Sequence, residues 1–303
     1  MQYKQQTLTN RKDINMGEQI RLMTHNVWNC DRNHPAWEEK GEDCSAVVRV
    51  DSLVRVYMET KPDIIGGQEF SALMADLIKD HCHDAGLEYT LIWGRFTPIL
   101  YRADKFELVD SAFGAYPEFI DGYEGSFNDV KSKSWNIGVF REKKSGELFV
   151  FATTHLWWRS SDKNKLFSPV SEYQAYSDEA REYQISILTG KVKEFAQKYG
   201  CPAVVVGDFN TDYRSKAVQY LLANGFRHAH DIAVEHAEES IGYHNCFPYG
   251  YDTFYSDKPF EEAIDHIVLM GEKSGSVKRF ERYSPDYYFP ISDHSPAYID
   301  MEL

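Results

Sequence analysis

The sequence predicts an α+β fold in which two mixed β-sheets pack face to face and are covered by helices. Apolar runs of strand length alternate with segments of helical periodicity in both halves of the chain. Strands at 137–140 and 148–152 flank the turn residues Lys144-Ser145-Gly146, a pattern typical of a β-hairpin. Helices between strands, combined with hairpins, favour layered mixed sheets.

The first half of the chain begins with two strands, each followed by a helix. In the first helix, Val50, Val54 and Tyr57 recur at helical spacing, and Pro62 ends it. The predicted elements are, in order, a strand at 22–28, a helix at 45–61, a strand at 62–69, a helix at 72–85, short strands within 87–113 and a loop at 114–134.

The second half contains the most strongly patterned helix, at 177–199, which Gly200 and Pro202 end. Its apolar stripe is predicted to consist of Ala180, Tyr183, Ile187, Val192, Phe195 and Ala196. The other predicted elements are a strand at 149–156, a strand at 204–210, a helix at 215–223 and strands at 263–270 and 296–301.

Five apolar runs carry polar side chains where strands give way to loops. These side chains are Asn26, Glu69, His155, Asp208 and Asp265, and His294 lies in a loop just before the final strand. A hard cation such as Mg²⁺ takes oxygen ligands, and a histidine held by a carboxylate can activate water. The combination therefore indicates divalent-metal phosphoester hydrolysis.

A resemblance to a known family is carried by motifs in a fixed order. They are Asn26, Gln68-Glu69, Thr154-His155-Leu156, Gly207-Asp208-Phe209-Asn210, Asp265 and Ser292-Asp293-His294. Together they resemble the endonuclease/exonuclease/phosphatase superfamily, which includes deoxyribonuclease I-like nucleases, inositol polyphosphate 5-phosphatases, neutral sphingomyelinases and poly(A) deadenylases. The resemblance implies a four-layered αββα sandwich and leaves the substrate open, because this fold hosts many substrates.

The resemblance also implies a role for each matching residue. Asn26, Glu69 and Asp293 are expected at a Mg²⁺ or Mn²⁺ ion. The expected catalytic residues are Asp208 and Asn210, which orient water and hold a phosphoryl oxygen, His294 as general base, Asp265 as its partner, and His155 as a hydrogen-bond donor to the scissile phosphate.

Aromatic residues next to these motifs are candidates for substrate binding. The residues expected to contact substrate are Trp157, Trp158, Arg159 and Tyr251. They could stack on a sugar or base, meet lipid, or serve as ordinary packing.

Length and composition predict one domain over residues 20–303, preceded by a polar lead-in at 1–19. The chain has 303 residues, 43% of them hydrophobic, and no apolar run of the roughly 20 residues that a membrane helix needs. The five scattered cysteines contain no Cys-x-x-Cys pair, which favours reduced thiols in a cytoplasmic protein. Export after removal of a signal peptide absent from this sequence stays open.

The net charge of −14 disfavours duplex DNA as a partner, since duplex binding depends on neutralising several phosphates with lysine and arginine. Charge therefore favours a small or sugar-like phosphomonoester or phosphodiester. The alternatives are a nuclease acting on RNA or single-stranded DNA through aromatic stacking, a sphingomyelinase-like lipid phosphodiesterase, and an inactive binding module. No protein partner is inferable from the sequence.

Overall fold

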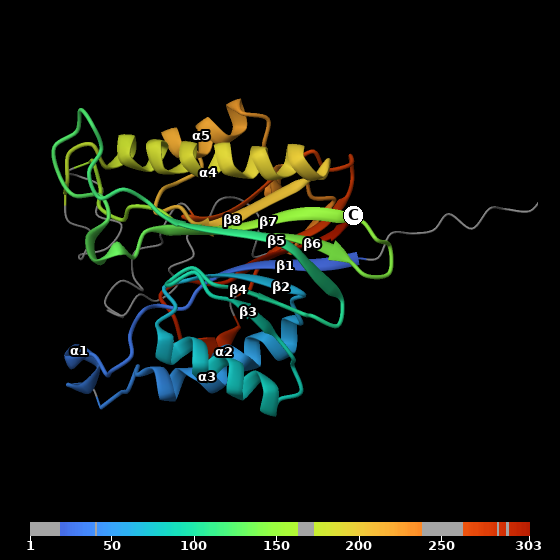
Figure 1. Cartoon of the computed structure of the whole chain (residues 1–303). Helices are drawn as coiled ribbons and strands as arrows, with labels where there is room; N and C mark the ends of the chain where they lie inside the picture. The colour runs from blue at the N-terminus through green and yellow to red at the C-terminus, as the bar shows by residue number, and fades with distance from the viewer. Residues whose placement is uncertain (1–18, 40, 163–172, 238–262, 284, 289–290) are drawn as a thin grey trace, which may run out of the picture.

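Two β-sheets lie face to face in the computed structural model, with helices on both outer sides (Figure 1). The structure describes residues 19–39, 41–162, 173–237, 263–283, 285–288 and 291–303. This arrangement confirms the predicted α+β class and the four-layered αββα sandwich. The expected lead-in, apart from Gln19, and the candidate substrate residue Tyr251 lie outside the described residues.

The first sheet is mixed and contains the strands nearest both ends of the chain. Its strands are β1 (Gln19–Asn26), β2 (Ile64–Gln68), β3 (Thr90–Ile92), β4 (Ile99–Tyr101), β10 (Glu235–His236), β12 (Val277–Arg282) and β13 (Ala297–Glu302). Their order within the described residues is β10-β12-β13-β1-β2-β4-β3. β1 is parallel to β2 and antiparallel to β13, so the carboxyl ends of β1 and β2 meet at one edge.

The second sheet is also mixed. Its strands are β5 (Phe106–Ala115), β6 (Ser134–Glu142), β7 (Leu148–His155), β8 (Ala203–Asp208), β9 (Arg227–His228) and β11 (Asp265–Met270). In the described part of the chain their order is β5-β6-β7-β8-β11-β9. β7 and β8 are parallel, whereas β6 and β11 run antiparallel to their neighbours, so β6 and β11 begin where β7 and β8 end.

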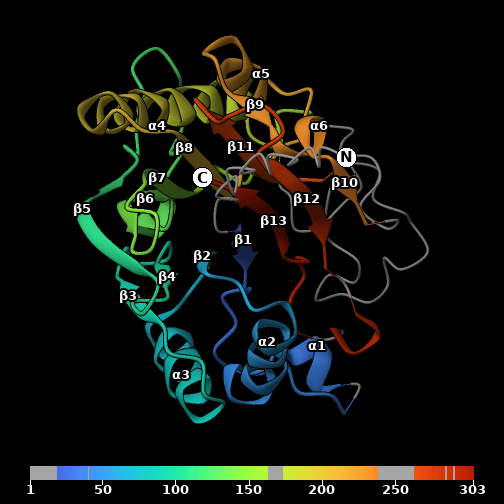
Figure 2. The same ribbon diagram turned by 90° about the vertical axis from the view of Figure 1, so that its right-hand side faces the viewer.

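Helices form the two outer layers, as Figure 2 shows from the side. α2 (Ala46–Thr60) and α3 (Ala72–Asp84) cover the first sheet, and α4 (Ser177–Tyr199) and α5 (Lys216–Ala223) cover the second. The shorter elements are α1 (Pro35–Glu38), α6 (Ala229–Ile232) and the 3₁₀ turns Asp129–Lys131 and Asp286–Tyr288. No helix in the described part of the chain combines the length and apolar character needed to cross a bilayer.

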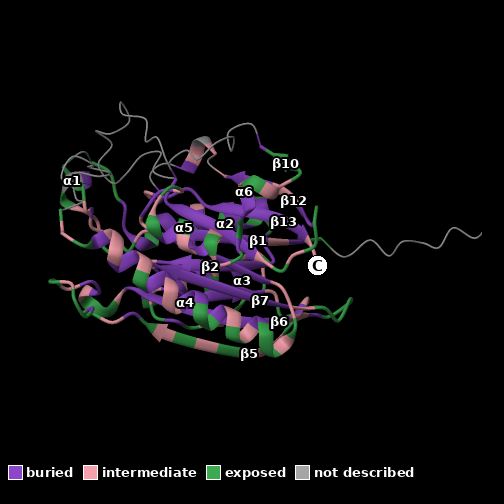
Figure 3. Ribbon diagram, turned by 90° about the horizontal axis from the view of Figure 1, so that it is seen from above, coloured by how far each residue is buried: buried purple, intermediate pink, exposed green. Residues whose placement is uncertain are grey.

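Alternating side chains of each central strand fill different apolar cores. On β1, Leu22 packs between the sheets while Met23 packs under α2 and α3. On β7, Phe151 faces the inter-sheet core while Ala152 faces α4. The period of two along a strand produces this division. In Figure 3 the central strands are buried along their length, whereas β5 at the sheet edge alternates between exposed and partly buried residues.

The structure corrects the predicted apolar stripe of α4. Tyr183 is 43% exposed, and Ile187 and Phe195 are only partly buried. The buried face consists of Ser177, Ala180, Arg181, Gln184, Ile185, Leu188, Thr189, Val192 and Ala196. The prediction was wrong because it considered only apolar residues, whereas several residues of the buried face are polar.

Two strand predictions also need correction. β12 was missed, because charged residues interrupt its sequence Val-Lys-Arg-Phe-Glu-Arg and only Val277 and Phe280 supply buried apolar side chains. The strand expected at 204–210 ends at Asp208, and Asn210 adopts a left-handed backbone conformation with φ of 53°.

The two sheets approach closely where β2 faces β7 and β8. A Cβ atom on Gly66 would lie 2.5 Å from Val206 Cγ2 and 2.8 Å from Thr153 Cβ. Nearby, Gln68 bridges the layers: its Nε2 donates to Thr153 Oγ1 at 2.8 Å. Glycine is therefore required at position 66 by the space between the layers.

We expect Gly66→Ala to lower the free energy of unfolding by about 1–3 kcal/mol, because the added methyl group overpacks the inter-sheet core. Urea unfolding measures the change. Gly190→Ala is the matched control, since Gly190 lies in α4 with no atom within 4 Å of the new Cβ. That variant should gain about 0.5–1 kcal/mol from helix propensity. Equal stability of the two variants would contradict the proposed close approach.

Candidate active site

Five strand termini meet at one edge of the sandwich, and each brings a polar side chain. In the first sheet, β1 ends at Asn26 and β2 is followed by Glu69. In the second sheet, β7 ends at His155, β8 ends at Asp208 and the antiparallel β11 begins at Asp265. Asp208 is in register with His155 on one side and with Asp265 on the other. The site therefore spans the seam between the sheets.

The side chain of Asn26 forms a hydrogen bond to the other sheet. Its Nδ2 donates to Asp208 Oδ2 at 3.0 Å, while its Oδ1 accepts from the Trp28 backbone N–H at 2.9 Å. The amide oxygen thus faces the backbone and not the centre of the site. The metal-binding role expected for Asn26 requires this amide to turn.

His294 and Asp265 form a buried hydrogen-bonded pair. His294 Nδ1 lies 2.8 Å from Asp265 Oδ2. An ionised carboxylate only accepts, so Nδ1 carries the proton and Nε2 presents its lone pair. Nε2 lies 3.4 Å from Asn26 Nδ2 and 3.8 Å from Asp208 Oδ2. This tautomer suits a general base directed at the centre of the site.

A hydrogen-bond chain fixes the backbone of His294. The Tyr288 hydroxyl donates to the His294 carbonyl oxygen at 2.6 Å. Tyr288 has only one hydrogen to give, so His25 Nε2, at 2.7 Å, donates to that hydroxyl. His25 Nδ1 then accepts from the Tyr57 hydroxyl at 3.0 Å. Burial lowers the pKa of His25 to about 3, so a neutral ring sustains this chain at neutral pH.

Lys133 enters the site although no sequence motif indicated it. Lys133 is buried, and its Nζ donates to His155 Nε2 at 2.6 Å. Burial lowers the pKa of Lys133, and the carboxylates of Glu69 and Asp208 act in the opposite direction. Burial, with the positive charge of Lys133, holds the pKa of His155 well below its usual value. His155 is thus a neutral acceptor in this structure, and its Nε2 faces Lys133.

The hairpin register explains how Lys133 reaches the site. Lys133 directly precedes β6, and Ser134 pairs with His155 across the β6–β7 ladder. Asn128 holds the Lys133 backbone: its Oδ1 accepts from the Lys133 N–H at 2.8 Å. The sequence placed Lys133 in a loop, but extending the predicted hairpin as far as His155 would have found it.

Glu69 reaches the same centre from the first sheet. It has a φ of 60°, and its Oε2 accepts from the Asn29 backbone N–H at 2.9 Å. Its Oε1 lies 3.7 Å from His155 Nε2, and Asp208 Oδ2 lies 3.4 Å from the same nitrogen. Ligand atoms of these three residues all lie within 4.8 Å of one another. The two carboxylates of this cluster offer oxygen ligands for a divalent cation, whereas His155 Nε2 is engaged by Lys133.

Burial raises the pKa values of two nearby carboxyls, and neighbouring carboxylates contribute to a lesser degree. Burial raises the pKa of Asp208 to about 7, and Asp265 and Glu69 add to that shift. Burial also raises the pKa of Asp293 to about 6, with a further contribution from Glu69. A bound cation would oppose both shifts by favouring the ionised carboxylates. Asp293, an expected metal ligand, lies beside His294 and outside the cluster of Glu69, His155 and Asp208.

Asn210 lies two residues beyond the end of β8. Its backbone N–H donates to Asp208 Oδ1 at 2.8 Å, and its side-chain Nδ2 donates to the Leu156 carbonyl at 3.0 Å. Asn210 therefore ties the end of β8 to the loop that follows β7.

The expected substrate residues after β7 differ in accessibility. Trp157 is 1% exposed and packs against Phe127, so its ring is part of the core and presents no surface to a ligand. Trp158 is partly exposed, and the Arg159 guanidinium lies 5.1 Å from its ring centroid. Only Trp158 and Arg159 of this trio keep surface that a substrate could contact.

Similar solved structures share this fold. An endonuclease/exonuclease/phosphatase from Bacteroides vulgatus is 22% identical with a TM-score of 0.69, covering 94% of this chain and 99% of that one. A mannosyl-6-phosphatase from Bacteroides thetaiotaomicron is 20% identical with a TM-score of 0.69, covering 94% and 100%. TDP2 of D. rerio, complexed with a single-strand DNA product, is 17% identical with a TM-score of 0.61, covering 94% and 99%. No curated protein sequence matches this chain.

The clustered carboxylates and histidines form groups that could hold a metal ion. The sequence profile of the Endonuclease/Exonuclease/phosphatase family matches residues 23–294. The chain belongs to this family. Its members are hydrolases that act on phosphate esters with divalent metals, and this chain is an enzyme of that class.

We expect Tyr288→Phe to lower the free energy of unfolding by about 1–3 kcal/mol, because it leaves His25 and the His294 carbonyl without a buried partner. The turnover number should fall as well, since His294 loses its anchor. Urea unfolding and steady-state kinetics measure the two effects. Tyr287→Phe is the matched control: its hydroxyl meets the exposed Glu59, and its loss should change stability by less than about 0.5 kcal/mol. Equal stability and equal turnover numbers in the two variants would contradict the proposed role of the hydrogen bonds that link Tyr57, His25, Tyr288 and His294.

Proposed function

We propose that this enzyme hydrolyses a phosphomonoester or phosphodiester by in-line attack of a water that His294 activates. The hydrogen-bonded pair of His294 and Asp265, facing the cluster of Glu69, His155 and Asp208, is the observation that carries this proposal. A general base close to a cation site is what such a displacement needs, and His294 Nε2 lies 3.8 Å from Asp208 Oδ2.

The metal is Mg²⁺ or Mn²⁺, with Glu69 as the principal ligand. Asp208 offers a carboxylate oxygen beside Glu69, and Asp293 and a turned Asn26 amide are the further candidates. The lone pair of His155 Nε2 is already engaged by Lys133. When bound, the cation supplies positive charge against the phosphate and the leaving oxygen.

The residues of this chain divide the remaining work. His294 Nε2 accepts the proton of the attacking water, and Asp265 stabilises the imidazolium that forms. Asn26 and Asp208, at 3.4 Å and 3.8 Å from that nitrogen, orient the water. Lys133 adds a positive charge for the phosphate, and His155 acts through the hydrogen bond that positions Lys133.

A small or sugar-like phosphate ester is the favoured substrate. The net charge of −14 opposes a long polyanion, and the similar fold of a mannosyl-6-phosphatase supports a compact substrate. Hydrolysis of RNA or single-stranded DNA is the second candidate, favoured by the likeness to TDP2 in complex with a single-strand DNA product. Duplex DNA is not expected, on the same grounds of charge.

An activity screen with and without Mg²⁺ tests the proposal, and Glu69→Gln tests the site. The screen covers sugar phosphates, inositol phosphates, sphingomyelin and nucleic acids. Glu69→Gln should weaken Mg²⁺ affinity at least about 10-fold in a folded protein, as measured by calorimetry. Glu107→Gln is the control, because Glu107 is exposed on β5 and pairs with Arg141. Hydrolysis that is indifferent to Mg²⁺, or unchanged affinity in Glu69→Gln, contradicts the assignment.

The pair of His294 and Asp265 should behave as one unit in kinetics. His294→Ala is expected to lower the turnover number by about 10²–10⁴, the usual contribution of general base catalysis. Adding Asp265→Asn should cost scarcely more, because groups acting together are strongly non-additive. If the two losses simply multiply in the double variant, the pair does not work as proposed.

A further inference from the structure

A polar cavity of about 330 Å³ lies beside the candidate active site. Residues 160–162 of the loop after β7 form one wall, and Asp178 and Arg181 of α4 form another. The third wall comes from the segment between Thr211 and Lys216, which follows β8. The loops start just after His155 and Asp208, so the cavity opens at the same sheet edge as those two residues.

The walls of this cavity are held in place by buried hydrogen bonds. Arg181 Nη1 donates to the carbonyl oxygens of Trp157 at 3.0 Å and Arg159 at 2.7 Å. Asn210 Nδ2 donates to the Leu156 carbonyl at 3.0 Å, joining the two loops. Arg181 is 4% exposed, and its Nε makes no hydrogen bond with the described residues. Arg181 therefore fixes the cavity wall from inside through the bonds of its Nη1, while its Nε is shielded from the cavity.

The charge of the lining favours a neutral ligand over a second phosphate. Its carboxylates are Asp162, Asp178 and Asp212, and its cations are Arg181, Arg214 and Lys216, which gives three charges of each sign. Arg181 is already paired with Asp178, and Lys216 with Glu179 at 2.7 Å. An anion entering this cavity would meet three carboxylates without a surplus of positive charge.

The chemistry of the lining matches hydroxyl groups. Carboxylates accept from hydroxyls, guanidinium groups donate to them, and the serine and threonine side chains of the lining can do either. Within the described residues no aromatic side chain lines the cavity, whereas single-stranded nucleic acids are usually bound by stacking on aromatic side chains. We propose that this cavity binds the hydroxyl-bearing group of the substrate, which makes the substrate the phosphate ester of a sugar or related polyol.

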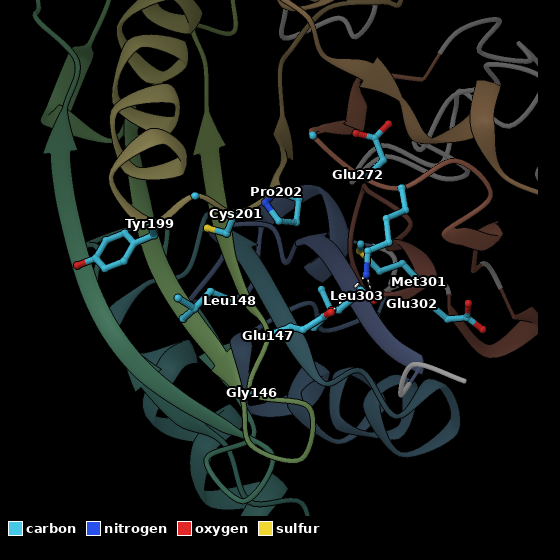
Figure 4. A pocket seen from close by; sticks show the side chains of 13 residues that line it. Gly146, Glu147, Leu148, Tyr199, Cys201, Pro202, Glu272, Met301, Glu302 and Leu303 are labelled. Atoms are coloured by element: carbon cyan, nitrogen blue, oxygen red, sulfur yellow. Dashed lines mark hydrogen bonds and ion pairs between the residues drawn. The ribbon is translucent and has the colours of Figure 1, made fainter. Parts of the chain in front are cut away.

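A second cavity, shown in Figure 4, does not compete for this role. It has about 290 Å³ and is lined by Leu148, Tyr199, Cys201 and Met301 among others. Leu148 begins β7, and Cys201 lies just before β8, so this cavity lies at the opposite end of those strands from His155 and Asp208. It provides the place for control substitutions.

The inference rests on the proposed phosphoesterase function and is tested by relative specificity. Mannose 6-phosphate and glucose 6-phosphate are compared with p-nitrophenyl phosphate, an ester without sugar hydroxyls. Arg214→Met and Asp162→Asn should each lower the ratio of kcat/KM for the hexose phosphates to that for p-nitrophenyl phosphate by about 10-fold, the effect of one lost charged hydrogen bond. Both side chains are exposed, so folding should not depend on them. Arg214→Lys should restore part of the ratio.

Arg227→Met is the matched control and should leave the ratio unchanged. Arg227 pairs with Glu272, which lines the distant cavity of Figure 4. A ratio that is unaffected by Arg214→Met and Asp162→Asn overturns the inference while the hydrolase assignment stands. Preference for oligonucleotides or for bisphosphorylated sugars over hexose monophosphates overturns it as well.

A binding measurement without turnover tests the polyol site separately from the hydrolase activity. Mannose 6-phosphate is titrated calorimetrically in excess EDTA with the wild-type chain and with Arg214→Met. If no ester is hydrolysed with Mg²⁺, the proposed function fails. Saturable binding that weakens about 10-fold in Arg214→Met would then still support the cavity as a polyol site, whereas no binding, or equal binding by both proteins, would overturn it.

Discussion

The close approach of the two sheets at Gly66 is the constraint on which the site depends. Asn26 and Glu69 come from one sheet, whereas His155 and Asp208 come from the other. Stacked sheets are usually about 10 Å apart, a distance that two short side chains reaching toward each other can only just span. The absence of a side chain at Gly66 lets Val206 and Thr153 move in, and the Asn26–Asp208 hydrogen bond of 3.0 Å becomes possible. The packing of the two sheets thereby sets the distances between the polar side chains of the site.

The charges at this seam explain why the enzyme class needs a cation. Glu69, Asp208, Asp265 and Asp293 gather there, and a substrate phosphate would add further negative charge. Lys133 offsets part of it, but burial lowers the pKa of that lysine. Burial of several carboxylates is costly unless they are paired or hold a metal. Burial raises the pKa of Asp208, and the neighbouring carboxylates Asp265 and Glu69 act in the same direction, whereas His294 and Lys133 oppose them.

The sequence predicted those features that local patterns encode. Apolar periodicity located α2, α3, α4 and most strands. Polar residues at the ends of the predicted strands indicated a shared site. The position of Lys133 depends on the β6–β7 register, and the hairpin predicted at 137–140 and 148–152 stopped short of the pairing between Ser134 and His155. The burial of Trp157 depends on packing against Phe127, some 30 residues away in the chain, so an aromatic cluster next to a motif could not reveal it. Arg181 and Gln184 escaped the α4 stripe for a related reason: they are polar residues buried to hold a loop.

That loop connects catalysis with recognition. Gln184 Oε1 accepts from the Trp157 N–H at 2.8 Å, and Arg181 binds the carbonyl of the same residue. The backbone that leaves His155 is therefore fixed by α4 before it forms the wall of the polar cavity. In the proposed site, strand ends position His155, Asp208 and Asp265, whereas His294 lies in the loop before β13. The loops anchored to α4 face the proposed polyol group of the substrate. Loops tolerate sequence change better than the strands they connect. Substrate preference can therefore change in residues 160–162 and 211–216 without disturbing the pair of Asp265 and His294, which lies on the other side of Asp208.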